Sequence, residues 1–112
     1  HGSTPDDIRN HPALRGVNLS ARLGSPGRTF IGVLATRSLL IAGEGGVHTN
    51  DAGRRVALLR AYDKRTGEDA GAVEMPQKQT GSPMTYVVNG KQYIVVAVSG
   101  NDGAELLAYA LP

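Results

Sequence analysis

The chain has 112 residues, which suits one small domain or a part of a larger one. It contains no cysteine, which excludes disulfides, thiolate metal sites and a cysteine nucleophile. Its 12 basic residues exceed the 10 acidic ones by only two and are dispersed, and the densest pairs, Arg54-Arg55 and Lys64-Arg65, have no aromatic stacking platform, so no nucleic-acid partner is predicted. No apolar run approaches the ~20 residues of a membrane span.

The first segment, residues 1–27, is predicted to be an irregular lead-in. Thr4 and Pro5, followed by two aspartates, resemble a helix start with Thr4 as the N-cap and Pro5 in the first helical position. One short turn over residues 8–11 is expected before Pro12 ends it.

Residues 28–76 are predicted to form a complete, four-stranded blade-like sheet. The second strand contains a continuous apolar run, Leu39–Leu40–Ile41–Ala42, which suits a strand buried on both faces. A long insertion rich in glycine, asparagine and aspartate, residues 43–55, separates the second strand from the third. The expected strands are 28–34, 37–42, 56–63 and 68–75.

Residues 77–112 are predicted to form an incomplete final blade of three strands. Asn89-Gly90 lies between two β-rich runs, a sequence typical of a two-residue hairpin turn. Such a turn places Tyr86 opposite Tyr93 on the neighbouring strand. The third strand, 105–111, follows, and the absence of a fourth strand leaves an edge that another segment must cover.

The third strands of the two sheets share a sequence pattern. The stretch LLRAYDKRTG, residues 58–67, is partly repeated by LLAYA at residues 106–110, about 47 residues later. Repeat periods of about 40–50 residues are typical of β-propeller blades. The predicted fold class is therefore all-β, with antiparallel four-stranded propeller-blade-like sheets amounting to about one and three-quarter blades.

Five motifs follow one another along the chain: LRAYD (59–63), TG (66–67), TGSPMTY (80–86), NGKQY (89–93) and AYALP (108–112). In this order and spacing they resemble the C-terminal end of pyrroloquinoline quinone (PQQ)-dependent dehydrogenases, in particular the membrane-type glucose dehydrogenase group with its eight-bladed propeller. The resemblance covers residues 28–112. The family's blade signature, Ala-x-Asp-x-x-x-Gly-x-x-x-Trp, has a tryptophan that docks between blades where this chain has Gly71.

The resemblance implies an oxidoreductase that oxidises sugars or alcohols at PQQ bound beside calcium, in the periplasm or outside the cell, although the polar start of the chain is not that of a signal peptide. Most of the chemistry in the family belongs to earlier blades. The chain alone is therefore expected to be an inactive fragment that binds neither cofactor tightly. Its expected partners are the rest of the parent propeller, or further copies of itself joined through open strand edges.

In such a propeller the cofactor lies over one end of the ring, on loops that correspond here to residues 43–55, 75–82 and 99–103. The polar candidates for cofactor binding in these loops are Glu44, Asp51, Arg54 and Asn101. The family pattern places a carboxylate near the quinone, and the insertion leaves open whether Glu44 or Asp51 takes that place. The alternative for these residues is a solvated surface loop or, for Asn101, a plain turn.

Ser82 and Ser99 have no histidine nearby to act as a base, so no Ser-His-Asp arrangement is predicted and no catalytic residue is assigned. His48 is a lone histidine in its loop, and metal ligands occur in convergent sets, so no metal site is predicted. Asp63 is expected to accept backbone hydrogen bonds within its own turn.

Two other functions are considered beside the dehydrogenase. One is a non-catalytic β-sheet module that assembles with itself or binds a partner along its open edge. The other is a carbohydrate-binding, propeller-like module.

Overall fold

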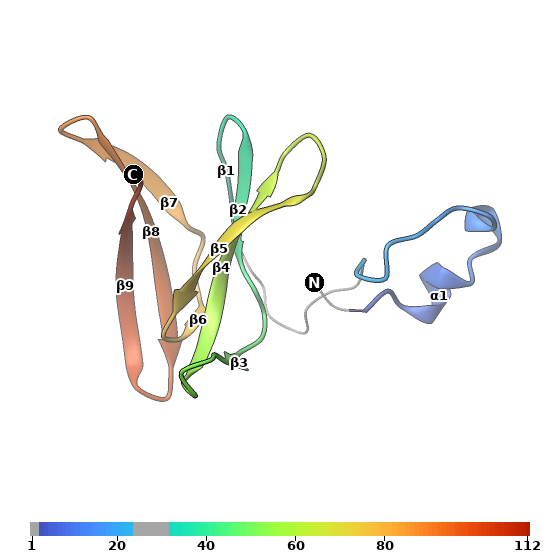
Figure 1. Ribbon diagram of the computed structural model, residues 1–112, viewed down its shortest axis with the longest axis horizontal. Coiled ribbons are helices and arrows are strands. Elements are labelled where there is room, and N and C mark those ends of the chain that lie inside the picture. The colour runs from blue at the N-terminus through green and yellow to red at the C-terminus, as the bar shows by residue number, and fades with distance from the viewer. Residues whose placement is uncertain (1–2, 24–31) are drawn as a thin grey trace.

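A computed structural model describes residues 3–23 and 32–112. Within these residues the chain forms two antiparallel sheets that lie side by side, with the lead-in segment to one side of them (Figure 1). This confirms the predicted all-β class of blade-like sheets. The helical elements of the described part are α1 (Asp6–Arg9) and one 3₁₀ turn (Pro12–Leu14). The strands are β1 (Val33–Ala35), β2 (Leu39–Gly43), β3 (His48–Thr49), β4 (Arg55–Asp63), β5 (Asp69–Met75), β6 (Lys78–Gln79), β7 (Met84–Val88), β8 (Lys91–Gly100) and β9 (Gly103–Ala110).

The lead-in differs from the prediction at its first helix. Pro5, not Thr4, occupies the N-cap position of α1, and no side chain caps the helix. Thr4 is only 3% exposed because it ties the two ends of the lead-in together. Its hydroxyl donates to the Ser20 carbonyl oxygen at 2.5 Å and accepts from the Leu23 amide at 3.1 Å. A long-range hydrogen bond has replaced the local cap.

The first sheet has the order β1–β2–β4–β5. The expected first strand, 28–34, begins among residues outside the described part. Within the described part, β1 starts at Val33. The insertion of residues 43–55 is not wholly a loop, because β3 within it pairs with Val56 and Arg55 of β4. β2 and β3 therefore lie in succession along the same edge of β4.

The second sheet repeats this arrangement around β8. β9 pairs along one edge of β8, while β6 and β7 pair in succession along the other. The sheet has four strands where three were expected, because the two-residue β6 is added to β7, β8 and β9. The Asn89-Gly90 turn has the positive φ values of a two-residue hairpin, 49° and 75°.

The predicted hairpin register is confirmed in detail. Tyr86 pairs with Tyr93, and their rings stack with centroids 5.2 Å apart and planes at 12°. Asp63 also behaves as predicted, since its Oδ1 accepts from the amides of Arg65 and Thr66 at 2.8 and 3.1 Å.

The core lies between the two sheets. Alternate residues of β4 and of β8 point into it, as the two-residue period of a strand requires. Its fully buried members are Ala57, Met75 and Val98, with Val96 at 1% exposure. Within residues 3–23 and 32–112, no helix is long and apolar enough to cross a membrane.

One glutamine joins the two sheets. Gln79 of β6 is 3% exposed, and its Oε1 accepts from the Gly43 amide of β2 at 2.6 Å. Its Nε2 donates to the carbonyl oxygens of Gly32 and Gly81 at 2.7 and 2.6 Å. A Cβ atom at Gly43 would lie 2.6 Å from Gln79 Oε1, so only glycine allows β2 to approach this closely.

Candidate binding site at the loop end of the sheets

The three loops singled out in the sequence meet at one end of the two sheets. The β8–β9 turn and the start of β4 both lie at the lower end of the molecule in Figure 1. Between them is a pocket of about 460 Å³, called the loop-end pocket below. Its lining comes from all three loops: Val47, Arg55, Pro76, Gln77, Lys78, Ser99, Gly100, Asn101 and Asp102.

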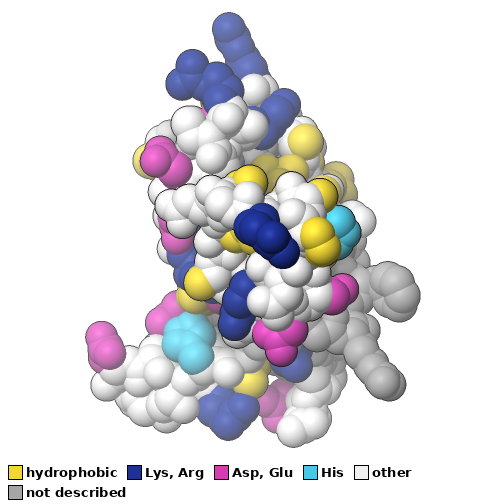
Figure 2. All heavy atoms as spheres, turned by 90° about the vertical axis from the view of Figure 1, so that its right-hand side faces the viewer, with side chains coloured by type: hydrophobic (Ala, Val, Ile, Leu, Met, Phe, Trp, Pro, Cys, Tyr) yellow, Lys and Arg dark blue, Asp and Glu magenta, His cyan; other side chains and the backbone are white. Residues whose placement is uncertain are grey.

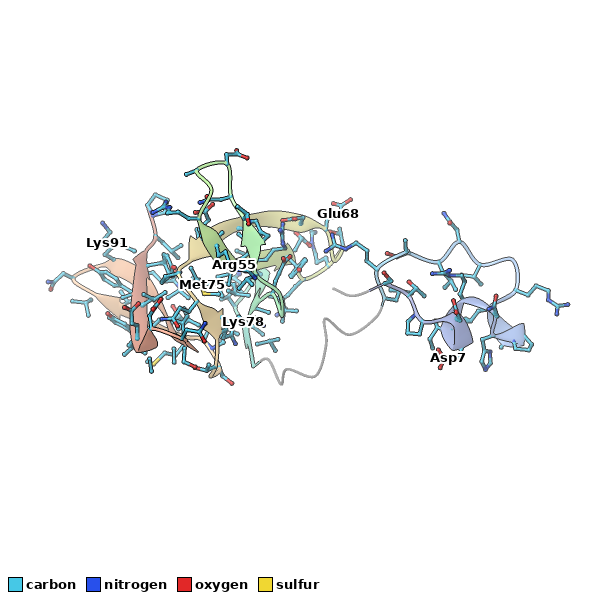
Figure 3. The ribbon with its side chains drawn as sticks, turned by 90° about the horizontal axis from the view of Figure 1, so that it is seen from below. Asp7, Arg55, Glu68, Met75, Lys78 and Lys91 are labelled. Atoms are coloured by element: carbon cyan, nitrogen blue, oxygen red, sulfur yellow. The ribbon has the colours of Figure 1, made fainter. Side chains whose placement is uncertain are left out.

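Two cations and one carboxylate face this pocket. Arg55 and Lys78 lie close to Met75, with Lys91 well apart from them (Figure 3). In the described part of the chain, neither Arg55 nor Lys78 has a carboxylate within 4.0 Å, and Asp102 forms no ion pair. The pocket therefore carries a net positive charge whose cations are available to an anionic ligand.

A buried amide lines the same pocket. Gln77 is 8% exposed, and its Oε1 has no hydrogen-bond partner among the described residues. A Cβ atom at Gly100 would lie 2.3 Å from this oxygen, so the β8–β9 turn and the Gln77 side chain are fitted closely together. Sequence analysis missed Gln77, because nothing in a polar loop sequence indicates which amide will be buried.

The four predicted cofactor-binding residues occupy different places. Asn101 lines the loop-end pocket. Arg54 lines an adjoining cavity of about 390 Å³ that shares Arg55 and Asp102 with it. Asp51 is exposed in the turn between β3 and β4, and it lines neither cavity. The structure thus brings Arg54 and Asn101 to one region and leaves Asp51 outside it.

Glu44 is engaged elsewhere. Its Oε1 accepts from Arg60 Nε at 2.7 Å, and Arg60 also contacts Asp69 through Nη1. The hydrogen bond to Glu44 raises the pKa of Arg60 above its ordinary value, although burial works in the opposite direction. This ion-pair cluster joins β2, β4 and β5, so the Glu44 carboxylate serves an internal contact of the first sheet.

A second cavity, of about 410 Å³, lies between this cluster and the lead-in segment. Arg22 and Leu23 line it from the lead-in, and Arg60, Tyr62 and Asp69 from the sheet. Burial raises the pKa of Tyr62 above its ordinary value. On the face shown in Figure 2, several basic side chains gather at the upper end, and basic and acidic side chains are mixed over the rest.

The loop-end pocket does not match the needs of a planar, tricyclic quinone such as PQQ. Arg54, Arg55 and Lys78 are suitable partners for carboxylates. A ring system also needs an apolar or aromatic surface against its face, and among the described lining residues only Val47 and Pro76 are apolar and none is aromatic. The described residues also contain no group of three or more His, Asp or Glu side chains that could hold a metal ion.

Comparison with known proteins finds relatives among quinoprotein dehydrogenases. The profile of one family, "PQQ: Glucose/ethanol/alcohol dehydrogenase, beta-propeller domain", matches residues 1–94. Quinoprotein glucose dehydrogenase of Escherichia coli is 42% identical over 60 residues, which cover 48% of this chain and 8% of that protein. The glycerol dehydrogenase large subunit of Gluconobacter thailandicus is 33% identical over 60 residues, with the same shares covered.

A longer alignment joins the chain to quinate/shikimate dehydrogenase (quinone) of Acinetobacter baylyi. It is 30% identical over 102 residues, covering 85% of this chain and 11% of that protein. The chain thus spans about a tenth or less of the length of these curated relatives. No solved structure matches the chain.

Proposed function

The chain belongs to the family of PQQ-type glucose/ethanol/alcohol dehydrogenase β-propellers, and from that premise we propose that it is the C-terminal propeller segment of a quinoprotein dehydrogenase that oxidises sugars or alcohols with PQQ. The observation that carries this proposal is the match of the family profile to residues 1–94. The two blade-like sheets and the meeting of three loops at one of their ends support it. Calcium beside the quinone and a periplasmic or extracellular location belong to the same proposal.

The segment contributes structure rather than chemistry in this proposal. It covers 8% of the length of the glucose dehydrogenase relative, and its loop-end pocket lacks a surface for the quinone ring. The remaining blades of the parent protein supply that surface and the catalytic groups, since cofactor enzymes need a site that orients the reactive ring. The isolated chain is therefore inactive and binds PQQ weakly.

An assay of two proteins tests this function. The 112-residue chain, and the longer protein obtained by extending its reading frame upstream, are each mixed with PQQ, calcium and a redox dye. Glucose, glycerol and ethanol are then offered as substrates. We expect the longer protein to reduce the dye with at least one of them and the chain alone to reduce none. A longer protein that binds PQQ but oxidises no sugar or alcohol contradicts the proposal.

A second candidate function is a non-catalytic module that assembles with itself or with a partner. It is favoured by large apolar side chains on outer surfaces, among them Met84 at 54% and Leu106 at 73% exposure. A defined oligomer in solution, together with no binding of PQQ by the longer protein, supports this function over the dehydrogenase. Binding of glucose without any quinone supports the carbohydrate-binding alternative.

A further inference from the structure

The two sheets share one pattern of strand pairing, and this pattern identifies which of their faces are equivalent. In the first sheet, Tyr62 of β4 pairs with Leu40 of β2. In the second sheet, Tyr109 of β9 pairs with Ile94 of β8. Both tyrosines belong to the repeated strand motif. β2 and β4 of the first sheet can therefore be matched, residue by residue, with β8 and β9 of the second.

Equivalent leucines in the two sheets are buried to very different extents. Leu59 lies three residues before Tyr62, and Leu106 lies three residues before Tyr109. Leu59 is 5% exposed because the second sheet covers it, whereas Leu106 is 73% exposed. The outer face of the second sheet therefore repeats a face that, in the first sheet, is covered by another sheet. Its residues are Met84, Tyr86, Val95, Ala97, Leu106 and Ala108.

The first sheet presents a matching surface on the side away from the core. The residues of this outer face are Val33, Leu40, Ala42, Leu58, Tyr62 and Ala72. Tyr62 and Leu40 are neighbours on it, just as Tyr109 and Ile94 are neighbours on the face of the second sheet that packs into the core. We propose that copies of the chain associate head to tail, with the outer face of the second sheet of one copy packed on the outer face of the first sheet of the next copy.

The outer face of the first sheet is open to such a partner. Val33 is 54% exposed, and Ala72 is exposed as well. The lead-in borders this face beside Tyr62, where Arg22 and Leu23 line the cavity of about 410 Å³. The segment is therefore separated from Tyr62 by a cavity and leaves room for a second copy.

Charge favours a contact between unlike faces over a contact between two like ones. The outer face of the second sheet has Lys78 and Lys91 at its ends and, among the described residues of its strands, no carboxylate. The outer face of the first sheet has one cation and three carboxylates, namely Arg60, Glu44, Asp69 and Glu74. Two second sheets would bring like charges together, whereas a second sheet and a first sheet bring opposite charges together.

Arg60 makes the contact between copies weaker than the contact between the sheets of one chain. It lies two residues before Tyr62, and the equivalent residue of the second sheet, two before Tyr109, is the core-packed Leu107. A face that contains a charged side chain is more costly to bury than one that contains leucine. We therefore expect the copies to exchange, with a fraction of monomer that rises on dilution.

Two variants that each block one face test the proposal in the 112-residue chain. Leu106→Lys places a charge on the outer face of the second sheet, and Val33→Lys places one on the outer face of the first. Sedimentation velocity is expected to show species larger than a monomer for the unsubstituted chain. Association is expected to be about tenfold weaker, or more, in each variant alone, because the new charge must be desolvated.

Val87→Lys is the matched control for these variants. Val87 is 65% exposed and belongs to β7, but it pairs with Gln92 on the opposite face of the second sheet from Leu106. Its substitution is expected to leave association unchanged. Circular dichroism checks that each variant is folded. If one of the two blocking variants does not fold, Met84→Lys replaces it on the second sheet or Ala72→Lys on the first.

Mixing the two blocking variants tests the head-to-tail geometry itself. The Leu106→Lys chain keeps an intact face on its first sheet, and the Val33→Lys chain keeps one on its second sheet. An equimolar mixture is therefore expected to form a 1:1 complex that grows no further, because each complex has only blocked faces left. The unsubstituted chain instead continues to add copies until a ring closes, or forms an open chain, as heterologous contacts do.

Four results overturn the proposal: an unsubstituted chain that stays monomeric at its highest soluble concentration, association lost in only one blocking variant, a mixture without a complex, or an equal loss in Val87→Lys. The inference gives a geometry to the self-assembly of the second candidate function and rests on the pairing of the two sheets. Because the measurement contains no quinone and no dye, its failure is distinct from failure of the oxidation assay, which tests the dehydrogenase function.

Discussion

Gly71 occupies a bulge in β5, where the family signature has tryptophan. The pairing with β4 shifts here, so that Ala61 pairs with Gly71 while Tyr62 pairs with Asp69. Gly71 adopts a φ of +131°, which side-chain-bearing residues rarely adopt. Beside it lies an apolar groove of about 330 Å³ between the sheets, lined in part by Leu59, Ile94 and Tyr109. At this position the chain therefore has both an unusual backbone conformation and no side chain.

We expect Gly71→Ala to lower the free energy of unfolding by about 1–3 kcal/mol, because the residue must keep a strained φ although space for a Cβ is available. Urea unfolding followed by circular dichroism measures the change. Gly46→Ala is the control, since a Cβ there also meets open space and the backbone has no positive φ. Equal free energies of unfolding for Gly71→Ala and the unsubstituted chain would show that the backbone of the bulge adjusts to alanine without strain.

Tyr109 makes the stability of the chain sensitive to high pH. Its hydroxyl donates to the Glu74 carbonyl oxygen at 2.9 Å, and burial raises its pKa above the ordinary value of 10.0. The folded state therefore holds this proton more tightly than the unfolded state does. The resulting stability is fully present below the unfolded pKa and is lost as pH rises through the folded pKa.

The free energy of unfolding is accordingly expected to decline above about pH 10, and to decline less steeply in Tyr109→Phe, which cannot ionise. Urea unfolding at a series of pH values measures both slopes. Tyr62, whose pKa burial also raises, contributes to the remaining decline. Identical slopes in the two proteins would exclude Tyr109 as a source of the effect.

At the scale of elements, β6 acts mainly as a connector between the sheets. It is only two residues long, and yet Gln79 bonds to the backbone of β2 and to the segments before β1 and after β6. A short strand can hold two sheets together in this way, because buried backbone groups need hydrogen-bond partners and one amide side chain offers both a donor and an acceptor.

Gln79→Leu keeps the side-chain volume but leaves the Gly43 amide and two carbonyl oxygens without their partner. We expect it to lower the free energy of unfolding by about 3 kcal/mol, near the upper range for buried hydrogen bonds. Thermal or urea unfolding gives the value. Gln92→Leu, which removes one side-chain bond to Thr85, is the control and is expected to cost about 1 kcal/mol. Similar losses in both variants would argue against the connecting role of β6.

At the scale of the whole molecule, the second sheet has an apolar outer face. Met84 and Tyr86 pair with residues of β8 whose side chains point away from the core, and Leu106 pairs with Ala97 on the same face. Leu106 is 73% exposed and Met84 54%. We expect such a face to be covered by a neighbouring blade in the proposed parent, or by another molecule in the isolated chain.

Leu106→Lys and Met84→Lys are expected to shift the isolated chain toward the monomer, because a charge on this face must be desolvated on association. Sedimentation velocity measures the distribution of species. Val17→Lys is the control, since Val17 is similarly exposed, at 55%, but belongs to the lead-in. An unchanged distribution in both variants of the second sheet would place self-association elsewhere.

The sequence by itself determined the features that depend on near neighbours. Asn89-Gly90 selects a turn by its backbone preferences, and that turn sets the register of Tyr86 and Tyr93. The Asp63 turn, the repeated strand motif and the family resemblance follow in the same way from short stretches of chain.

Only the tertiary structure decided which residues far apart in the sequence meet. It buried Gln77 against Gly100, joined Glu44 to Arg60 and gave Thr4 a partner at Ser20 in place of the helix cap. Each of these depends on the packing of segments 16 or more residues apart, and loop sequences rich in glycine and polar residues are compatible with many such arrangements. The loop-end pocket therefore became visible only when three loops were brought together.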